Sequence, residues 1–230
     1  IRDVAPSRGL GDVYKRQDKV VCIEIDSRLL PILDETLAEF DNIKIVNEDV
    51  LKVDLHKLIR EEFAGMPVAV CANLPYYITS PIIMSLLEAR LPIVSLTVMV
   101  QKEAAQRLCA APGSREVGAV SIAVQYYSQP QVLFQVSRGS FMPSPDVDST
   151  VIRLDVRQQP PVQLKKEEDF FRVVKAAFSQ RRKTLPNTLS AGLAIPKQQA
   201  LDLLERAGVA SNLRAEQLSM QQFADIANAL

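Results

Sequence analysis

The 230-residue sequence predicts an α/β fold. We expect a mostly parallel, doubly wound sheet with an antiparallel strand pair at one edge, followed by a small C-terminal helical domain. Short apolar runs alternate with helix-like segments from residue 19 onward. Two strand-like runs then follow each other closely, and the strand pattern stops at a linker, 158–161. With 47% hydrophobic and 23% charged residues, the chain has ample apolar material for a core.

The first part of the chain carries the alternating pattern. The segments expected to be strands are 19–25, 43–47, 68–72 and 93–100. The segments expected to be helices are 28–39, 55–63, 81–89 and one that follows the fourth strand and runs through residue 108. Such strand–helix–strand repeats join parallel strands and put helices on both faces of the sheet.

The later elements break this alternation. After a helical segment at 118–127, strands are expected at 131–136 and 150–156. The loop between them is rich in Pro, Ser and Gly and leaves no room for a crossover helix, so we expect an antiparallel pair. Beyond the linker, helices are expected at 167–179, 197–207 and 220–230, with a short turn near residue 215.

Polar residues end three consecutive predicted strands. Glu24, Asp49 and Asn73 are 25 and 24 residues apart, which is one strand–helix unit each. Because ligands of open α/β sheets bind outside the carboxyl ends of the strands, we expect these residues to line one crevice. A carboxylate can accept both hydroxyls of a ribose, and an acid one strand further on can accept from an adenine amine. The alternative for each acid is a solvated loop carboxylate.

The tetrapeptide Asn73-Leu74-Pro75-Tyr76 follows the third strand and suits chemistry on a flat amine. The Asn73 side-chain carbonyl and the Leu74 backbone carbonyl can both accept hydrogen bonds from one NH2 group, while Tyr76 can stack on the ring that carries it. Pro75 stiffens the turn, and its carbonyls are expected to point outward. The alternative is an ordinary strand-to-helix turn with a proline.

This tetrapeptide resembles the Asn-Pro-Pro-Tyr-type signature of amino-methyltransferases that use S-adenosylmethionine. The leucine form is similar to that of the ribosomal RNA adenine N6,N6-dimethyltransferases, and the resemblance runs from about residue 19 to the C-terminus. The motifs that point to the small-subunit branch of this family are 21–26, 101–103, 141–149 and 178–184.

The resemblance implies a Rossmann-like class I methyltransferase sheet in 19–157, a helical C-terminal domain in 163–230, and transfer of two methyl groups to adenine N6 in small-subunit ribosomal RNA. It implies that S-adenosylmethionine is held by Glu24 at the ribose, by Asp49 at the adenine, and by Asn73. Asn73, Leu74, Pro75 and Tyr76 would be catalytic, and Tyr76 and Phe141 would hold the target base. The target base must be unstacked to reach such a pocket.

Residues 1–18 depart from the family. A strand and a glycine-rich loop should precede Glu24, but Gly9-Leu10-Gly11 follows no apolar strand. We therefore expect 1–18 to be an atypical, non-native leader, the chain to begin just before the family's second strand, and this chain by itself to bind the cofactor weakly.

Three consecutive cations, Arg181, Arg182 and Lys183, are expected at the end of a helix. They would contact ribosomal RNA phosphates, or alternatively form a solvated helix end that complements the helix dipole. Residues 1–162 carry 17 basic and 20 acidic residues and 163–230 carry 10 and 7, so any RNA footprint is expected to be local.

The sequence gives little support for a metal site or for a membrane or secretion signal. The three cysteines lack metal spacing and are expected to be buried, and His56 is the single histidine, so we expect no metal. No signal pattern or membrane-length apolar run is present, and we expect a cytoplasmic monomer. The rivals are a non-catalytic RNA-binding assembly factor, which would tolerate the missing glycine loop, and a nicotinamide-dependent dehydrogenase, which would use Glu24 but not the Asn73 turn.

Overall fold

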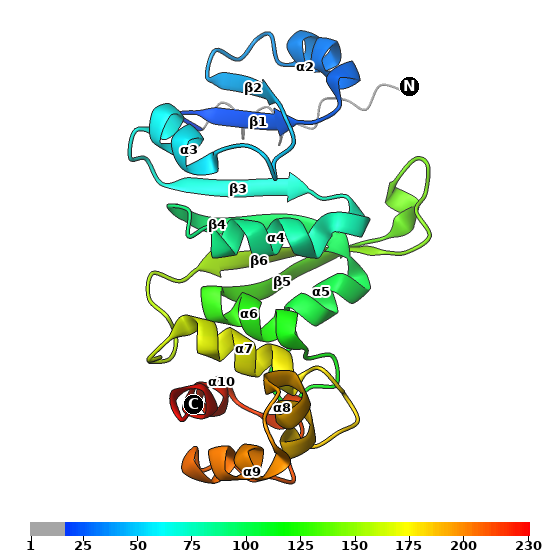
Figure 1. The fold of residues 1–230 in the computed structure, drawn as a ribbon. Coiled ribbons are helices and arrows are strands. Elements are labelled where there is room, and N and C mark those ends of the chain that lie inside the picture. The colour runs from blue at the N-terminus through cyan, green and yellow to red at the C-terminus, as the bar shows by residue number, and fades with distance from the viewer. Residues whose placement is uncertain (1–16) are drawn as a thin grey trace. The chain divides into compact units, whose positions relative to one another are not determined.

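The computed structural model describes residues 17–230 (Figure 1). Most of the predicted leader, including Gly9-Leu10-Gly11, lies outside the described residues. The strands are β1 (Val20–Glu24), β2 (Ile43–Asn47), β3 (Val68–Asn73), β4 (Ile93–Gln101), β5 (Ser128–Val136) and β6 (Ser149–Val156). The α-helices are α2 (Leu30–Thr36), α3 (Leu55–Phe63), α4 (Thr79–Glu88), α5 (Lys102–Leu108), α6 (Ala119–Tyr127), α7 (Glu167–Ala177), α8 (Leu185–Leu193), α9 (Lys197–Arg206) and α10 (Met220–Asn228). The short 3-10 turns are η1 (Ser27–Leu29), η2 (Tyr76–Ile78), η3 (Arg138–Ser140) and η4 (Ala215–Gln217).

The described residues form two compact units, which divide between residues 68 and 69. In the first unit β1 and β2 pair in parallel, with Glu24 opposite Asn47, so both strands end at the same edge. The Asn47 side-chain amide donates to the Glu24 backbone carbonyl at 2.7 Å and ties these two ends together. This parallel pair is the arrangement that the strand–helix–strand pattern predicts.

The second unit contains a four-stranded sheet in the order β3-β4-β6-β5. The backbone N–H of Leu74 donates to the carbonyl of Met99 at 3.4 Å, which brings the carboxyl ends of β3 and β4 together as in a parallel pair. β6 is antiparallel to both β4 and β5, so the predicted antiparallel pair at the sheet edge is confirmed. β5 is the outer strand and begins at Ser128, earlier than expected, because an edge strand tolerates Pro130.

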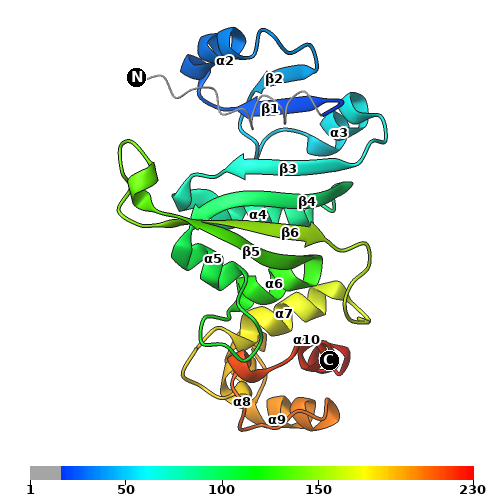
Figure 2. The ribbon, with the colours of Figure 1, turned by 180° about the vertical axis from the view of Figure 1, so that it is seen from behind.

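One face of this sheet carries the core of the second unit. Helix α4 lies in front of β4 in Figure 1 and behind it in Figure 2, with α5 and α6 on the same side. The fully buried side chains between helices and sheet include Ile83, Leu96, Ile122, Ile152 and Leu154. The predicted α/β class is therefore confirmed, with helices over the buried face.

Helix α7 packs on α6 through aromatic rings. Tyr126 and Tyr127 at the end of α6 meet Phe170 and Phe171 of α7 at centroid distances of 5.2–5.6 Å. The helical part therefore belongs to the same compact unit as β3–β6. The division into a catalytic domain, 19–157, and a helical domain, 163–230, stays a prediction.

One helix prediction needs correction, and one helix was not predicted. The helix expected over 28–39 is η1 followed by α2, which ends at Thr36; Pro31 lies in the first turn of α2, where a missing N–H costs nothing. Helix α8 is not among the predicted elements. No helix in the described residues is long and apolar enough to cross a membrane.

Candidate active site

The turn after β3 is built around a buried anchor. Leu74 is 7% exposed and its N–H is held by Met99 of β4, whereas Asn73, the last residue of β3, is exposed. The Asn73 side-chain amide and the Leu74 carbonyl have no hydrogen-bond partner among the described residues. The turn thus presents two hydrogen-bond acceptors at the carboxyl edge of the sheet. The hydrogen bond from the Leu74 N–H to Met99 holds its backbone.

Pro75 closes the turn and starts η2. With φ −58° and ψ 129° it lies outside the helix, and its carbonyl accepts from the Ile78 N–H and from the Thr79 hydroxyl, both at 3.1 Å. The expectation that the carbonyls of this turn point outward is therefore wrong for Pro75. Its carbonyl is used within the turn, because the last N–H of η2 and the hydroxyl of the first α4 residue both donate to it.

Tyr76 is half-buried, and its hydroxyl is hydrogen-bonded to the hydroxyl of Ser149 at 2.5 Å. Ser149 is fully buried and begins β6. The neighbouring Tyr77 is 85% exposed. The first tyrosine of the turn is therefore tied to the sheet, and the second is open to solvent.

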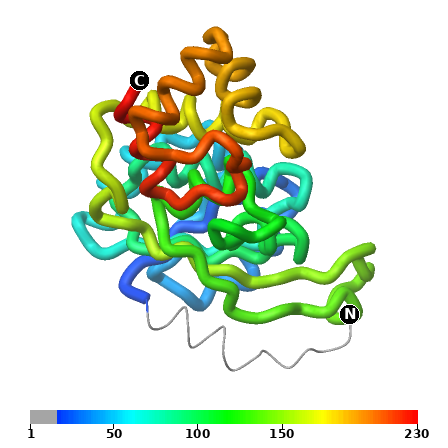
Figure 3. Tube along the Cα trace, turned by 90° about the horizontal axis from the view of Figure 1, so that it is seen from below, coloured from blue at the N-terminus to red at the C-terminus, as the bar shows by residue number. Residues whose placement is uncertain are grey.

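Phe141 is half-buried in the loop between β5 and β6, which extends away from the C-terminal helices in Figure 3. The loop is closed at its base: the Asp148 carboxylate accepts from the Arg138 N–H at 3.0 Å, and the Asp148 carbonyl accepts from the Lys102 N–H at 3.0 Å. Because Asp148 precedes Ser149, the base of this loop lies beside Tyr76. Among residues 17–230, no ring contact joins Phe141 to Tyr76.

Glu24 and Asp49 lie at the carboxyl edge of the strand pair in the first unit. One carboxylate oxygen of Glu24 accepts from the Asp26 N–H at 2.8 Å, and one of Asp49 accepts from the Leu51 N–H at 3.0 Å. Each carboxylate keeps a second oxygen with no hydrogen-bond partner among residues 17–230. Both acids are half-buried.

A third acid at this edge is already engaged. The Asp26 carboxylate accepts from the side chain of Arg28 at 2.6–3.2 Å, and this hydrogen bonding lowers the pKa of Asp26 to about 2. Asp26 is therefore committed to the turn after β1, whereas Glu24 and Asp49 each keep an oxygen that can accept from a ligand.

The structure brings some of the predicted site residues together. Glu24 and Asp49 share an edge of the first unit, and Asn73 to Tyr76 share an edge of the second unit with the loop that holds Phe141. The convergence of the two groups on one adenosine pocket stays a prediction, because they belong to different compact units.

The three cations lie beyond the helix that was expected to carry them. α7 ends at Ala177, and Arg181, Arg182 and Lys183 are exposed in the connection to α8. The helix-dipole alternative is therefore weakened, since the dipole acts within the last turn. The Arg181 guanidinium donates to the backbone carbonyl of Arg115 at 2.5 Å, which fixes this connection against the loop between α5 and α6.

The cysteines differ from the expectation. Cys71 is exposed because alternate residues of β3 point to its open face, whereas Cys22 and Cys109 are half-buried, and burial raises the pKa of the Cys109 thiol to about 11. Among the described residues, no group of three metal-ligating side chains could hold a metal ion.

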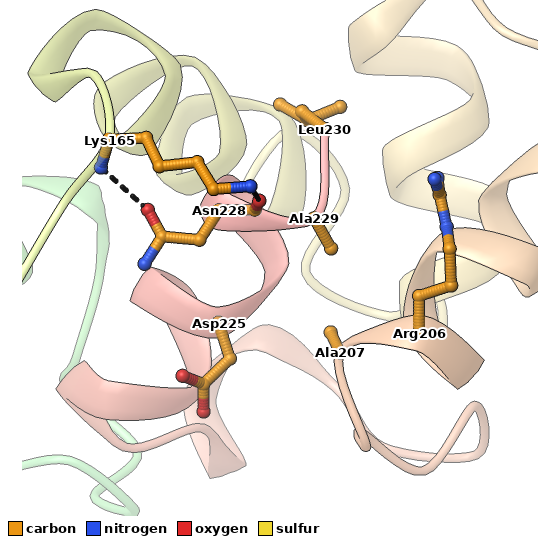
Figure 4. A pocket seen from close by; sticks show the side chains of 7 residues that line it. All are labelled: Lys165, Arg206, Ala207, Asp225, Asn228, Ala229 and Leu230. Atoms are coloured by element: carbon orange, nitrogen blue, oxygen red, sulfur yellow. Dashed lines mark hydrogen bonds between the residues drawn. The ribbon is translucent and has the colours of Figure 1, made fainter.

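A hollow of about 630 Å³ lies between the ends of α9 and α10 (Figure 4). Its Lys165 ammonium donates to the Asn228 carbonyl at 2.7 Å, and the Asn228 side chain accepts from the Lys165 N–H at 2.8 Å. These contacts pin the segment before α7 to α10. None of the predicted site residues lines this hollow.

The sequence interpretation missed the residues that support the turn. The Ser149 hydroxyl holds Tyr76, the Thr79 hydroxyl holds the Pro75 carbonyl, and Asp148 closes the loop of Phe141. The one sequence signal for these roles is the motif at 141–149, which ends with Asp148 and Ser149. It does not indicate their partners, which lie 10 residues away for Asp148 and 73 residues away for Ser149.

The chain is similar to known proteins over nearly its whole length. The family model described as ribosomal RNA adenine dimethylase matches residues 8–230, a range that begins within 1–18. The ribosomal RNA small subunit methyltransferase A of Alkaliphilus oremlandii is 48% identical over 233 residues, covering 100% of this chain and 81% of the relative. The protein of the same name from Geobacillus thermodenitrificans is 52% identical over 220 residues, covering 94% and 75%.

The solved structures similar to this chain include the following two. A dimethyladenosine transferase from Plasmodium falciparum has a TM-score of 0.77 at 24% identity, covering 94% of this chain and 82% of that one, and bears on the fold alone. The 23S rRNA methyltransferase ErmE has a TM-score of 0.72 at 26% identity, covering 98% and 88%.

Proposed function

Because this chain belongs to the ribosomal RNA adenine dimethylase family, we propose that it carries the catalytic region of an enzyme that dimethylates adenine N6 in small-subunit ribosomal RNA. The observation that carries the proposal is the turn after β3. Its two acceptors, the Asn73 amide oxygen and the Leu74 carbonyl, have no hydrogen-bond partner in residues 17–230 and stand on a backbone that Met99 and Thr79 fix.

These acceptors suit an exocyclic amine. The amine of adenine is a poor nucleophile because its lone pair is delocalised into the ring. Two acceptors that bind its protons favour a tetrahedral nitrogen with a free lone pair, and they do so without a strong general base. Positioning of the amine is then the main contribution of the protein.

The cofactor of this reaction is S-adenosylmethionine, whose sulfonium group supplies the methyl. The acceptor atoms fit an adenosine group: within residues 17–230, Glu24 and Asp49 each keep one carboxylate oxygen that can accept from a hydroxyl or an amine, at one edge of the first unit. In this proposal Glu24 binds the ribose, Asp49 binds the adenine, and Asn73 contributes from the end of β3.

The target base would be held by rings from two segments. Tyr76 stacks on the base from the turn, and Phe141 contributes from the loop that Asp148 closes. A base can enter such a site only when it is unstacked, which favours a loop of the ribosomal RNA over a duplex.

The partner is small-subunit ribosomal RNA within the small ribosomal subunit or its precursor, bound in the cytoplasm by a monomer. Arg181, Arg182 and Lys183 would contact its phosphates, because exposed cations add sequence-independent affinity for nucleic acid.

A methyl-transfer assay tests the proposal. The full-length protein, labelled S-adenosylmethionine and small ribosomal subunits should together give labelled RNA, and large subunits should not replace small ones. Binding to small subunits without any transfer would instead support the RNA-binding assembly factor, and a lack of cofactor crosslinking would agree with it.

A further inference from the structure

We propose that Ser149 is a positioning residue for the transfer reaction, which acts by holding the Tyr76 hydroxyl so that the ring keeps one orientation toward the target base. This inference rests on the proposed function. Its starting point is the hydrogen bond of 2.5 Å between the Tyr76 hydroxyl and the Ser149 hydroxyl, across 73 residues of sequence.

Ser149 is held firmly by its surroundings. It is the first residue of β6, is fully buried, and lies opposite Gln101 of β4 on one side and Val136 of β5 on the other. The residue before it, Asp148, accepts from the Lys102 N–H at 3.0 Å. A hydroxyl fixed between two strands can serve as a rigid reference point for a ring that reaches it.

The backbone of Tyr76 does not by itself fix the orientation of the ring, so the ring needs such a reference point. Tyr76 begins η2, a turn of three residues, and it is half-buried. Pro75 and Thr79 fix the backbone of the turn, but the orientation of an aromatic ring depends on its side-chain torsions. A bond at the far end of the ring restrains those torsions.

The bond also decides which part of Tyr76 can meet the substrate. The hydroxyl is directed to the buried Ser149, so the group available for contact is the ring face. Tyr76 is therefore expected to act by stacking, with the hydroxyl as its anchor.

Ser149 further links the two segments proposed to hold the base. Asp148 closes the loop of Phe141 through the Arg138 N–H at 3.0 Å, and Ser149, the next residue, binds Tyr76. The start of β6 thus fixes both the ring of Tyr76 and the base of the loop that holds Phe141.

A double-mutant cycle in the active protein tests the inference. Ser149→Ala and Tyr76→Phe should each lower kcat roughly three- to tenfold, as expected for loss of one hydrogen bond, and the double variant should be no slower than the slower single variant. The KM for S-adenosylmethionine should not change.

Ser128→Ala is the matched control. Ser128 is equally buried in the same sheet and its hydroxyl donates to the Val124 carbonyl at 2.8 Å, but it lies at the opposite end of the β5–β6 pair. This variant should lose some thermal stability and keep its kcat.

Two results would overturn the positioning role. In one, the kcat losses of the two single variants multiply in the double variant. In the other, Ser149→Ala loses only thermal stability, as the control does. Such a result would leave the proposed function standing, because the wild-type protein would still transfer methyl groups. Absence of transfer by the wild-type protein would overturn the proposed function itself, and the positioning role with it.

Discussion

At individual residues, the candidate site rests on acceptor atoms of Glu24, Asp49, Asn73 and Leu74 that have no hydrogen-bond partner within residues 17–230. The sequence could indicate the residue types, because Glu24, Asp49 and Asn73 stand at or just after strand ends, where ligands of such sheets bind. It could not indicate which of their atoms are free. The Asp26 N–H occupies one oxygen of Glu24, and Thr79 occupies the carbonyl of Pro75, and both contacts depend on the local path of the backbone.

Replacement of Glu24 tests the ribose contact. Glu24→Gln in the active protein should weaken S-adenosylmethionine binding about tenfold or more, because a hydrogen bond to a charged acceptor is stronger than one to an amide. Calorimetric titration measures this affinity. Glu39→Gln, an exposed acid in the same unit, should have no effect, and equal affinities for all three proteins would remove Glu24 from the cofactor site.

Among the helices and strands, prediction succeeded where local signals mark both ends. β2 and α3 have the predicted bounds; α3 begins after Asp54, whose carboxylate accepts from the Lys57 N–H at 2.9 Å. α8 was missed because it contains Pro186, Asn187 and Gly192, which are weak helix formers. Its stability comes from packing, which no local pattern reports.

Gly192 shows what that packing requires. A Cβ at this position would come within 2.5 Å of the Cα and Cβ of Ala176 on α7. Gly192→Ala should therefore destabilise the protein by about 1–3 kcal/mol, since the backbone of α7 must move. Thermal unfolding measures the loss. Gly118→Ala, where an added Cβ meets nothing within 4 Å, should be nearly neutral, and equal melting temperatures for the two variants would refute the close contact.

The junction between α6 and α7 should respond to alkaline pH. Glu167 pairs with Arg90 and accepts from the Tyr126 and Tyr127 hydroxyls at 2.9 and 3.2 Å. Burial, and then the Glu167 carboxylate, raise the pKa of Tyr127. The unfolded chain therefore releases this proton first, at about pH 10, and the contribution of Tyr127 to stability is present below that pH and is lost as the pH rises toward its native pKa.

Denaturant unfolding between pH 8 and pH 11 measures this effect. The free energy of unfolding should fall above about pH 10, and the fall should be shallower in Tyr127→Phe. Tyr77→Phe, at an exposed position, should behave as the wild type. A Tyr127→Phe curve parallel to the wild-type curve would contradict the assignment.

Over the molecule as a whole, the sequence predicted the class of fold and the antiparallel pair, β5 and β6, at the sheet edge. It did not predict that the compact units divide within β3, because the pattern of β3 is that of a continuous strand. It also did not predict that the cations lie in the α7–α8 connection, where Arg181 is held by the Arg115 carbonyl. Contacts of this kind join distant segments and leave no local signal.

The exposed cations of the α7–α8 connection should set the salt dependence of RNA binding. Replacing Arg181, Arg182 and Lys183 together by Gln should weaken binding to small subunits and reduce the slope of log affinity against log salt by about 0.7–0.9 per lost contact. Lys197→Gln with Arg206→Gln, two exposed cations of α9, is the control. If the triple variant kept the wild-type slope, this connection would not be part of the RNA surface.

The assignment of the Asn73 turn to adenine dimethylation is tested by the product itself. Small subunits treated with the active protein and S-adenosylmethionine should yield N6,N6-dimethyladenosine on mass spectrometry of the digested RNA. Asn73→Ala should slow its formation on the order of 10²–10³-fold while the circular dichroism stays that of a folded protein, because one positioned acceptor is lost. Asn212→Ala, at an exposed asparagine of the helical part, should form it at the normal rate. A folded Asn73→Ala protein that produced dimethyladenosine at a near-normal rate would contradict the account.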